Sequence, residues 1–150
     1  MLLELLDNYI QLSDLSLEES IKQIEDCKDF VKKNETAKQY LRLIEAKHRI
    51  LKSDYEKSYE IVTEVDKQLR LLRAYPKILY SILNYTYSLY YWQNKSYENF
   101  YKTTIKFLAY KNHNHIKSAE KEQIAERIIL ATLVSDNLLN FSEIMDSSLF

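Results

Sequence analysis

The sequence predicts a single all-α domain over residues 1–150, built from antiparallel helical hairpins. The 150 residues include no glycine and one proline, whereas average usage would supply about ten glycines. Tight β-hairpin turns favour glycine, so a chain without glycine is unlike one built from β-hairpins. Apolar residues recur at helical spacing along almost the whole chain, and side chains that can cap a helix stand where each run begins.

Composition excludes several functions. The chain carries 21 basic and 22 acidic residues, a balance typical of an ordinary soluble domain. Without glycine, phosphate-binding loops, dinucleotide fingerprints, nucleophile elbows and EF-hand loops are all excluded. No apolar run approaches the roughly 18 residues of a membrane span, and the opening Met1–Asp7 stretch has no basic leader. We therefore expect a protein of the cytoplasm and nucleus with no membrane partner, in which the single Cys27 forms no disulfide within the chain.

Capping residues place the first three helices. The Met1–Asp7 stretch predicts an amphipathic helix. Ser16 and Glu19 form a capping box, which predicts a helix from Ser16 to about Lys33. Asn34 can cap the next helix, which we expect to end near Lys52. One face of that helix carries Leu41, Ile44, His48 and Leu51.

Two longer helices follow. Ser53–Glu56 offers a second capping box, which opens a helical stripe of Tyr55, Tyr59, Val62, Val65, Leu69 and Leu72. Tyr75–Pro76 then breaks the pattern, with Pro76 at a natural first-turn position of a helix that runs to about Asn94. Residues 80–92 contain no charge, and their aromatic rings are spread around the helix. We therefore expect this helix to be interior, with neighbours on two sides.

The remaining chain predicts two full helices and a short one. Ser96 caps a helix whose inward residues are Tyr97, Phe100, Tyr101, Thr104, Phe107 and Leu108. A loop at 111–115 precedes a helix from Ser118 to about Val134, and a short final helix lies near 140–145. We expect seven or eight helices in all, with Tyr101 and Phe107 buried where successive hairpins stack.

The helix starts repeat at a nearly constant step along the chain. The step from Asp54 to Ser96 carries Tyr55 onto Tyr97. Its length lies within the ~40 to 47 residues of two-helix solenoid units, and the aromatic residue after the turn is tetratricopeptide-like. We predict tetratricopeptide-like hairpins that form a right-handed solenoid arm. The alternative is an irregular helical bundle with chance spacing.

No set of residues predicts chemistry. His113 and His115 have no cysteine or acid within two residues, so we expect solvated loop histidines and no metal site. His48 is expected to be a satisfied histidine at the edge of the core. The basic stretches 30–52 and 101–121 could face nucleic acid, but a pI near 6.3 is far from a basic footprint. The sequence thus predicts no catalytic residue, no cofactor, no metal and no nucleic-acid partner.

Three segments resemble a known family: Tyr97–Lys102, Phe107–Tyr110 and Ala131–Ile144. Their order and spacing are similar to those of the ninth non-ATPase subunit of the 26S proteasome regulatory-particle lid, called non-ATPase regulatory subunit thirteen in animals, a PCI-domain protein. The similar stretch covers about residues 85–145. Ser135 and Ser142 stand where the family has glycine, so the local turn geometry should differ there.

The resemblance implies a fold and a function. Members of this family carry helical repeats before a winged-helix PCI module, so residues 1–150 would be a fragment that lacks this module. It implies a non-catalytic scaffold, with other lid and base subunits as partners, in the complex that degrades ubiquitinated proteins. The alternatives are a helical arm of another PCI complex, such as the signalosome or translation initiation factor three, and a tetratricopeptide-like adaptor that binds proteins.

The apolar residues near the C-terminus are the candidate partner-binding residues: Leu138, Phe141, Ile144, Leu149 and Phe150. If the PCI module covers them in the parent protein, the isolated chain should self-associate through them. The alternative is that the last helix folds back and covers itself.

Overall fold

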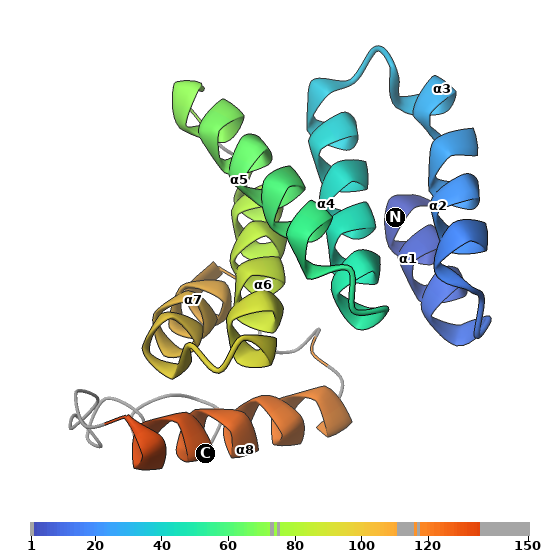
Figure 1. The fold of residues 1–150 in the computed structure, drawn as a ribbon. Coiled ribbons are helices and arrows are strands. Elements are labelled where there is room, and N and C mark those ends of the chain that lie inside the picture. Colours follow the sequence, from blue (N-terminus) through green and yellow to red (C-terminus); the bar gives the residue numbers. More distant parts are fainter. Residues whose placement is uncertain (1, 73, 75, 111–115, 117, 136–150) are drawn as a thin grey trace.

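The computed structural model describes residues 2–72, 74, 76–110, 116 and 118–135. Eight helices and no strand make up this described part of the chain (Figure 1). The prediction of an all-α helical repeat arm is therefore confirmed. Figure 1 shows α1 to α3 at one end of the arm, the α4 to α7 hairpins in the middle and α8 at the other end.

The N-terminal part contains α1 (Leu2–Leu12), α2 (Leu17–Asp26) and α3 (Lys28–Val31). The predicted capping box opens α2, because Ser16 Oγ accepts from the Glu19 amide at 3.2 Å and Glu19 Oε2 accepts from the Ser16 amide at 2.9 Å. The single helix predicted to about Lys33 is wrong, since the chain turns at Cys27. There the Cys27 amide bonds the Ile24 carbonyl at 3.2 Å, a tighter i→i+3 bond. The turn brings Val31 into the core beside α4.

The first full hairpin consists of α4 (Glu35–Leu51) and α5 (Tyr55–Leu71). Asn34 caps α4 as predicted, since its Oδ1 accepts from the Ala37 amide at 3.0 Å. The second predicted capping box is wrong. Asp54 is the N-cap residue of α5 and makes no side-chain cap, because its carboxylate accepts from Arg49 Nη1 at 2.6 Å. Ser53 lies in the turn with φ +68° and therefore cannot begin the helix.

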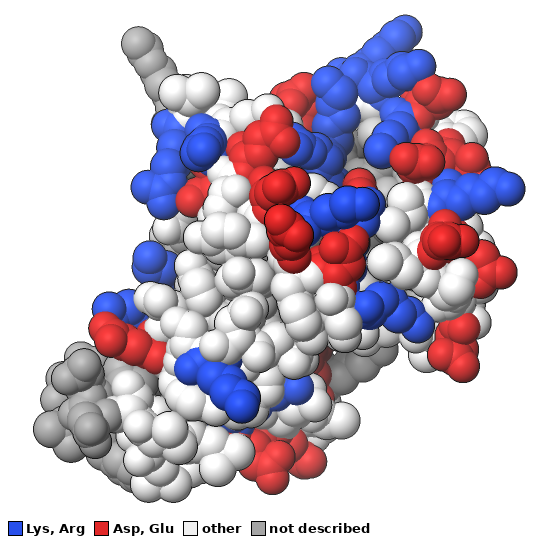
Figure 2. All heavy atoms as spheres, viewed as in Figure 1, with Lys and Arg blue, Asp and Glu red and all other residues white. Residues whose placement is uncertain are grey.

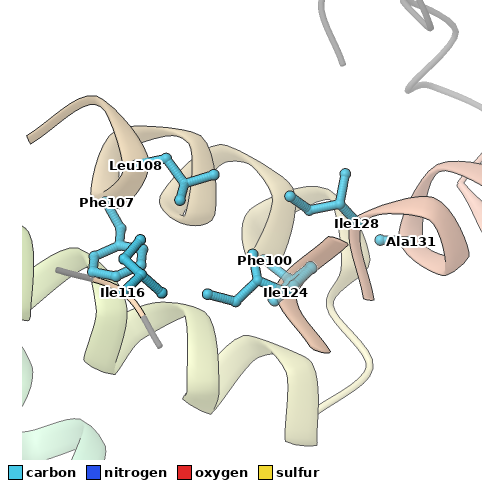
Figure 3. Packing of buried hydrophobic residues seen from close by; sticks show 7 residues of the cluster. All are labelled: Phe100, Phe107, Leu108, Ile116, Ile124, Ile128 and Ala131. Atoms are coloured by element: carbon cyan, nitrogen blue, oxygen red, sulfur yellow. The ribbon is translucent and has the colours of Figure 1, made fainter. Parts of the chain in front are cut away.

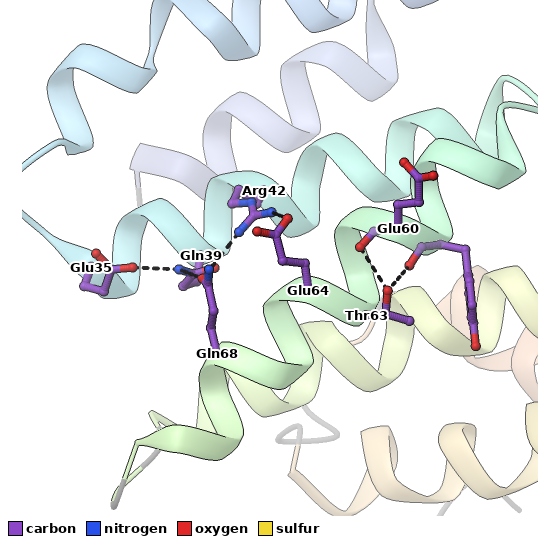
Figure 4. Close-up of polar contacts among 8 residues, drawn as sticks. Glu35, Gln39, Arg42, Glu60, Thr63, Glu64 and Gln68 are labelled. Atoms are coloured by element: carbon purple, nitrogen blue, oxygen red, sulfur yellow. Dashed lines mark hydrogen bonds and ion pairs between the residues drawn. The ribbon is translucent and has the colours of Figure 1, made fainter.

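Polar contacts join α4 to α5 along one side of this hairpin (Figure 4). Gln39 Nε2 donates to Gln68 Oε1 at 2.7 Å. Arg42 forms an ion pair with Glu64. Deeper in the hairpin, the buried Ser58 hydroxyl donates to the Ala46 carbonyl at 2.9 Å.

The second hairpin consists of α6 (Lys77–Gln93) and α7 (Tyr97–Tyr110). Helix α6 packs against α4, α5 and α7, and so has neighbours on more than one side as expected. Pro76 is its N-cap residue, one position before the predicted first turn. The side chains of α6 that are fully buried are small or aliphatic, and the aromatic rings lie half-buried around them. Buried hydroxyls bond their own helix, as when Thr86 Oγ1 donates to the Ile82 carbonyl at 2.8 Å.

Helix α8 (Ser118–Val134) begins and ends where the sequence predicts. It shares an apolar cluster with α7 (Figure 3), made of Phe100, Phe107, Leu108, Ile116, Ile124, Ile128 and Ala131. Phe107 is 2% exposed, as predicted. Tyr101 is only partly buried and packs at the edge of the cluster, so its predicted burial is wrong in degree.

The helix starts confirm the repeat. The step along the chain from the start of α4 at Glu35 to the start of α6 at Lys77 equals the step from α5 at Tyr55 to α7 at Tyr97. The two hairpins contact each other through α4 and α6. Such hairpins each contact their neighbours in the chain, which is the arrangement of a solenoid.

Candidate interaction surfaces

A cleft of about 950 Å³ lies among α1, α4, α6, α7 and α8. Its aromatic and aliphatic lining residues are Tyr40, Ile78, Ile82, Tyr85, Phe107, Tyr110 and Ala119. Its charged lining residues are Glu4, Asp7, Lys47 and Glu120, so acids outnumber bases. A lining that combines apolar and acidic side chains can accept an apolar side chain beside a basic one. The helices that line the cleft come from both ends of the arm.

A buried charged cluster joins α1 to α4 at this cleft. Asp7 Oδ2 accepts from Lys47 Nζ at 2.6 Å, and Asp7 Oδ1 lies 3.1 Å from His48 Nε2. Burial alone would raise the pKa of Asp7, but the bonds from His48 and Lys47 outweigh it and hold that pKa below its ordinary value. Asp7 is therefore an ionised partner of two buried donors, and the cluster fixes α1 in place.

This cluster settles the role of His48. The histidine is 3% exposed and does not line the cleft, although its neighbours Asp7 and Lys47 do. A general base must reach the proton that it abstracts. His48 is thus a satisfied histidine at the edge of the core, as predicted.

Two contacts hold α8 against α6. The Tyr85 hydroxyl donates to the Glu120 carboxylate, and burial together with that negative charge raises the pKa of Tyr85. The Arg127 guanidinium lies 5.1 Å from the centre of the Trp92 ring, within the range of a cation–π interaction. Burial lowers the pKa of Arg127, and the nearby Tyr85 raises it by less. Helix α8 is thereby held in place as one wall of the cleft, which it lines with Ala119, Glu120 and Gln123.

Tyrosines gather on α5 and α6. The Tyr59 and Tyr90 rings stack with centroids 4.6 Å apart, and the Tyr87 and Tyr91 rings stack at 5.8 Å. The Tyr87 hydroxyl donates to Asp66 at 3.4 Å. In Figure 2 charged side chains crowd the upper part of the face, over α2 to α5, and the middle of the face is largely uncharged. The rings therefore pack on one another within the arm.

Exposed apolar residues form a stripe on α1 that the sequence did not single out. Leu2, Leu5, Tyr9 and Leu12 are 57% to 81% exposed, and their spacing places them on one side of the helix. A neighbouring side of the same helix carries Ile10, which is buried, and Leu3 and Leu6, which pack against the core. An apolar surface wider than the side that meets the core is the signal that could have revealed a second contact surface.

Several predicted residues lie outside the described part of the chain. These are the loop residues His113 and His115 and the candidate partner-binding residues Leu138, Phe141, Ile144, Leu149 and Phe150. Their roles stay predictions. Among the described residues, no group of three or more His, Cys, Asp and Glu side chains could hold a metal ion. The described helices include none with the length and apolar character to cross a bilayer.

No curated protein matches this sequence. A family model described as PSD13 N-terminal repeats matches residues 3–150. The match confirms the resemblance to the proteasome lid subunit thirteen family and extends it well upstream of residues 85–145. The chain therefore belongs to the family of PSD13 N-terminal repeats.

Proposed function

We propose that this chain is a non-catalytic scaffold arm of the 26S proteasome regulatory-particle lid, and that it contributes to assembly of the complex that degrades ubiquitinated proteins. The observation that carries the proposal is the family match over residues 3–150, nearly the whole chain. A helical repeat arm suits this role, because each hairpin adds surface while it contacts only its neighbours. The partners are other lid and base subunits, in the cytoplasm and the nucleus.

The exposed stripe of α1 supports a scaffold role. A single exposed leucine is ordinary, because apolar atoms contribute more than half of any protein surface. Leu2, Leu5, Tyr9 and Leu12 instead line one side of one helix, and a continuous apolar stripe favours a protein partner. We assign this stripe to a neighbouring lid subunit.

Affinity purification tests the proposal. The tagged full-length protein is recovered from the cells that make it, and copurifying proteins are measured by quantitative mass spectrometry. Lid subunits should be the most enriched. Enrichment of signalosome subunits or of translation initiation factor three would favour the alternative PCI complexes, and no enrichment of any such assembly would refute the scaffold proposal.

A pair of variants tests the stripe separately. Leu5→Arg combined with Leu12→Arg places charge on the stripe and should lose at least one neighbouring subunit. The matched control is Leu71→Arg, because Leu71 is 84% exposed at the end of α5, away from the stripe. If the double variant keeps every partner, the stripe is not the contact surface, and the scaffold proposal then depends on another face.

A further inference from the structure

The cleft among α1, α4, α6, α7 and α8 is lined by whole faces of helices. The lining residues of α1 are Glu4, Asp7, Asn8 and Gln11. Those of α6 are Ile78, Ser81, Ile82 and Tyr85. Both sets have the spacing i, i+3, i+4 and i+7, which is the spacing of residues on one side of a helix. Each set therefore spans about two turns, or roughly 10 Å along its helix axis.

The cleft has an apolar side and two polar sides. Helices α6 and α7 contribute the apolar residues Ile78, Ile82, Tyr85, Phe107 and Tyr110. Ile78 is 47% exposed and Tyr110 is 45% exposed, so part of this apolar side is open to water. The polar sides come from α1, and from α8 through Glu120 and Gln123.

The charge of the described lining is negative. Asp7 and Lys47 offset each other, because Lys47 Nζ donates to Asp7 Oδ2 at 2.6 Å. The remaining charged lining residues are Glu4 on α1 and Glu120 on α8. Glu120 accepts from the Tyr85 hydroxyl, a bond that leaves its negative charge in place. The apolar side is thus bordered by a negative charge on each of two separate helices.

Both polar sides are held in place by contacts within the arm. Asp7 ties α1 to α4 through Lys47 and His48. Tyr85 and Trp92 of α6 hold α8 through Glu120 and Arg127. A binding surface that is already ordered loses less conformational entropy when a partner arrives.

We propose that this cleft binds a helix of another protein whose apolar stripe is flanked by lysine or arginine. In helix-in-groove recognition, apolar side chains at i, i+3, i+4 and i+7 enter an apolar groove. Here the stripe meets Ile78 and Tyr110, and the basic flanks face Glu4 and Glu120. The inference goes beyond the scaffold proposal, because it specifies a partner's chemistry at a surface separate from the exposed stripe of α1. It does not depend on which complex the arm joins.

Peptide binding to the full 150-residue chain tests the proposal. The probe is a labelled peptide of about 18 residues, long enough to form a helix, in which leucines form one stripe and lysines flank it on both sides. One comparison peptide has glutamate at every lysine position, and another has the same composition in an order that forms no stripe. Measured by fluorescence anisotropy, the lysine peptide should bind at least about tenfold more tightly than either comparison peptide.

Paired variants locate the binding site. Glu4→Gln with Glu120→Gln removes both charges, keeps an acceptor for Tyr85, and should weaken binding at least about threefold. The matched control is Glu60→Gln with Glu122→Gln, which removes two exposed charges outside the lining and should leave binding unchanged.

A second pair tests the apolar side. Ile78→Ala should also weaken binding at least about threefold. Leu72→Ala is its control and should not change binding, because Leu72 is 46% exposed and lies outside the lining.

The other outcomes contradict the proposal. Equal binding of the three peptides, or equal losses in the variants and their controls, would show that the cleft does not select a basic helix. Self-association of the chain that Glu4→Gln with Glu120→Gln abolishes would place a second copy in the cleft. If the variants fail to fold, hydrogen exchange of the unsubstituted chain decides the matter. The lysine peptide should slow exchange in residues 4–11 and 78–85 at least about threefold and leave α5 unchanged, and equal effects on α5, or none anywhere, would overturn the proposal.

Discussion

Truncation of Phe107 tests how the hairpins of the arm are held together. The side chain is 2% exposed, packs in the cluster shared by α7 and α8, and lies 4.9 Å from the Tyr85 ring of α6. Phe107→Ala therefore leaves a cavity among three helices. Buried phenylalanine truncations cost about 3 to 5 kcal/mol, and loss of the ring pair with Tyr85 adds to that cost. We expect a loss of about 4 kcal/mol in the free energy of unfolding.

Two tyrosine variants calibrate this value. Tyr101 lies at the edge of the same cluster, so Tyr101→Ala should cost about 1 to 2 kcal/mol, less than full burial would give. Tyr110 is 45% exposed, and Tyr110→Ala should cost less than about 1 kcal/mol. The assay is urea unfolding, followed by the helical circular dichroism signal. If Phe107→Ala costs no more than Tyr110→Ala, the three helices do not share the core described above.

Two further predictions concern the N-terminal helices. Asp7→Ala leaves Lys47 and His48 buried without their carboxylate and should cost about 3 kcal/mol at neutral pH, measured by urea unfolding. Because the pKa of Asp7 is held below its ordinary value of 3.8, its contribution is fully present above about pH 5 and is lost as the pH falls through the lowered pKa. The unsubstituted chain should therefore lose more stability on acidification than Asp7→Ala does, and equal losses would show that Asp7 is not the titrating group. Ser16→Ala removes the cap of α2 and should lower stability by about 1 kcal/mol. Ser53→Ala should change the stability by less than about 0.5 kcal/mol, since Ser53 caps no helix. A loss equal to that of Ser16→Ala would show that Ser53 does form the second capping box.

Local patterns predicted the helices because their causes are local. Asn34 and Ser16 cap helices through bonds to amides three residues away, and those residues are visible in the sequence. The hairpin repeat could likewise be read from the regular spacing of helix starts. The second capping box failed because Ser53 lies in the turn with a positive φ, and Asp54, which takes the N-cap position instead, bonds Arg49 of the preceding helix. A prediction of helix caps from sequence cannot tell whether a carboxylate will bond a helix amide or a side chain such as Arg49, because that choice depends on how the chain turns.

The interaction surfaces depend on contacts between distant parts of the chain. Asp7 and Lys47 are 40 residues apart, and only the packing of α1 on α4 joins them. The helical spacing of Tyr101 placed it on the inward face, but that spacing does not reveal how far the neighbouring helix reaches over the ring. The stripe of α1 was hidden for the same reason, since the sequence does not say which of two apolar sides meets the core.

The presence of the protein in assembled proteasomes tests the central claim most directly. 26S proteasomes are purified from the source cells through a tag on a subunit of the proteolytic core, and the amount of this protein is measured against the lid subunits by quantitative mass spectrometry. The scaffold proposal predicts that the protein is present in an amount equal to that of the lid subunits. Absence of the protein from proteasomes that contain a complete lid would contradict it.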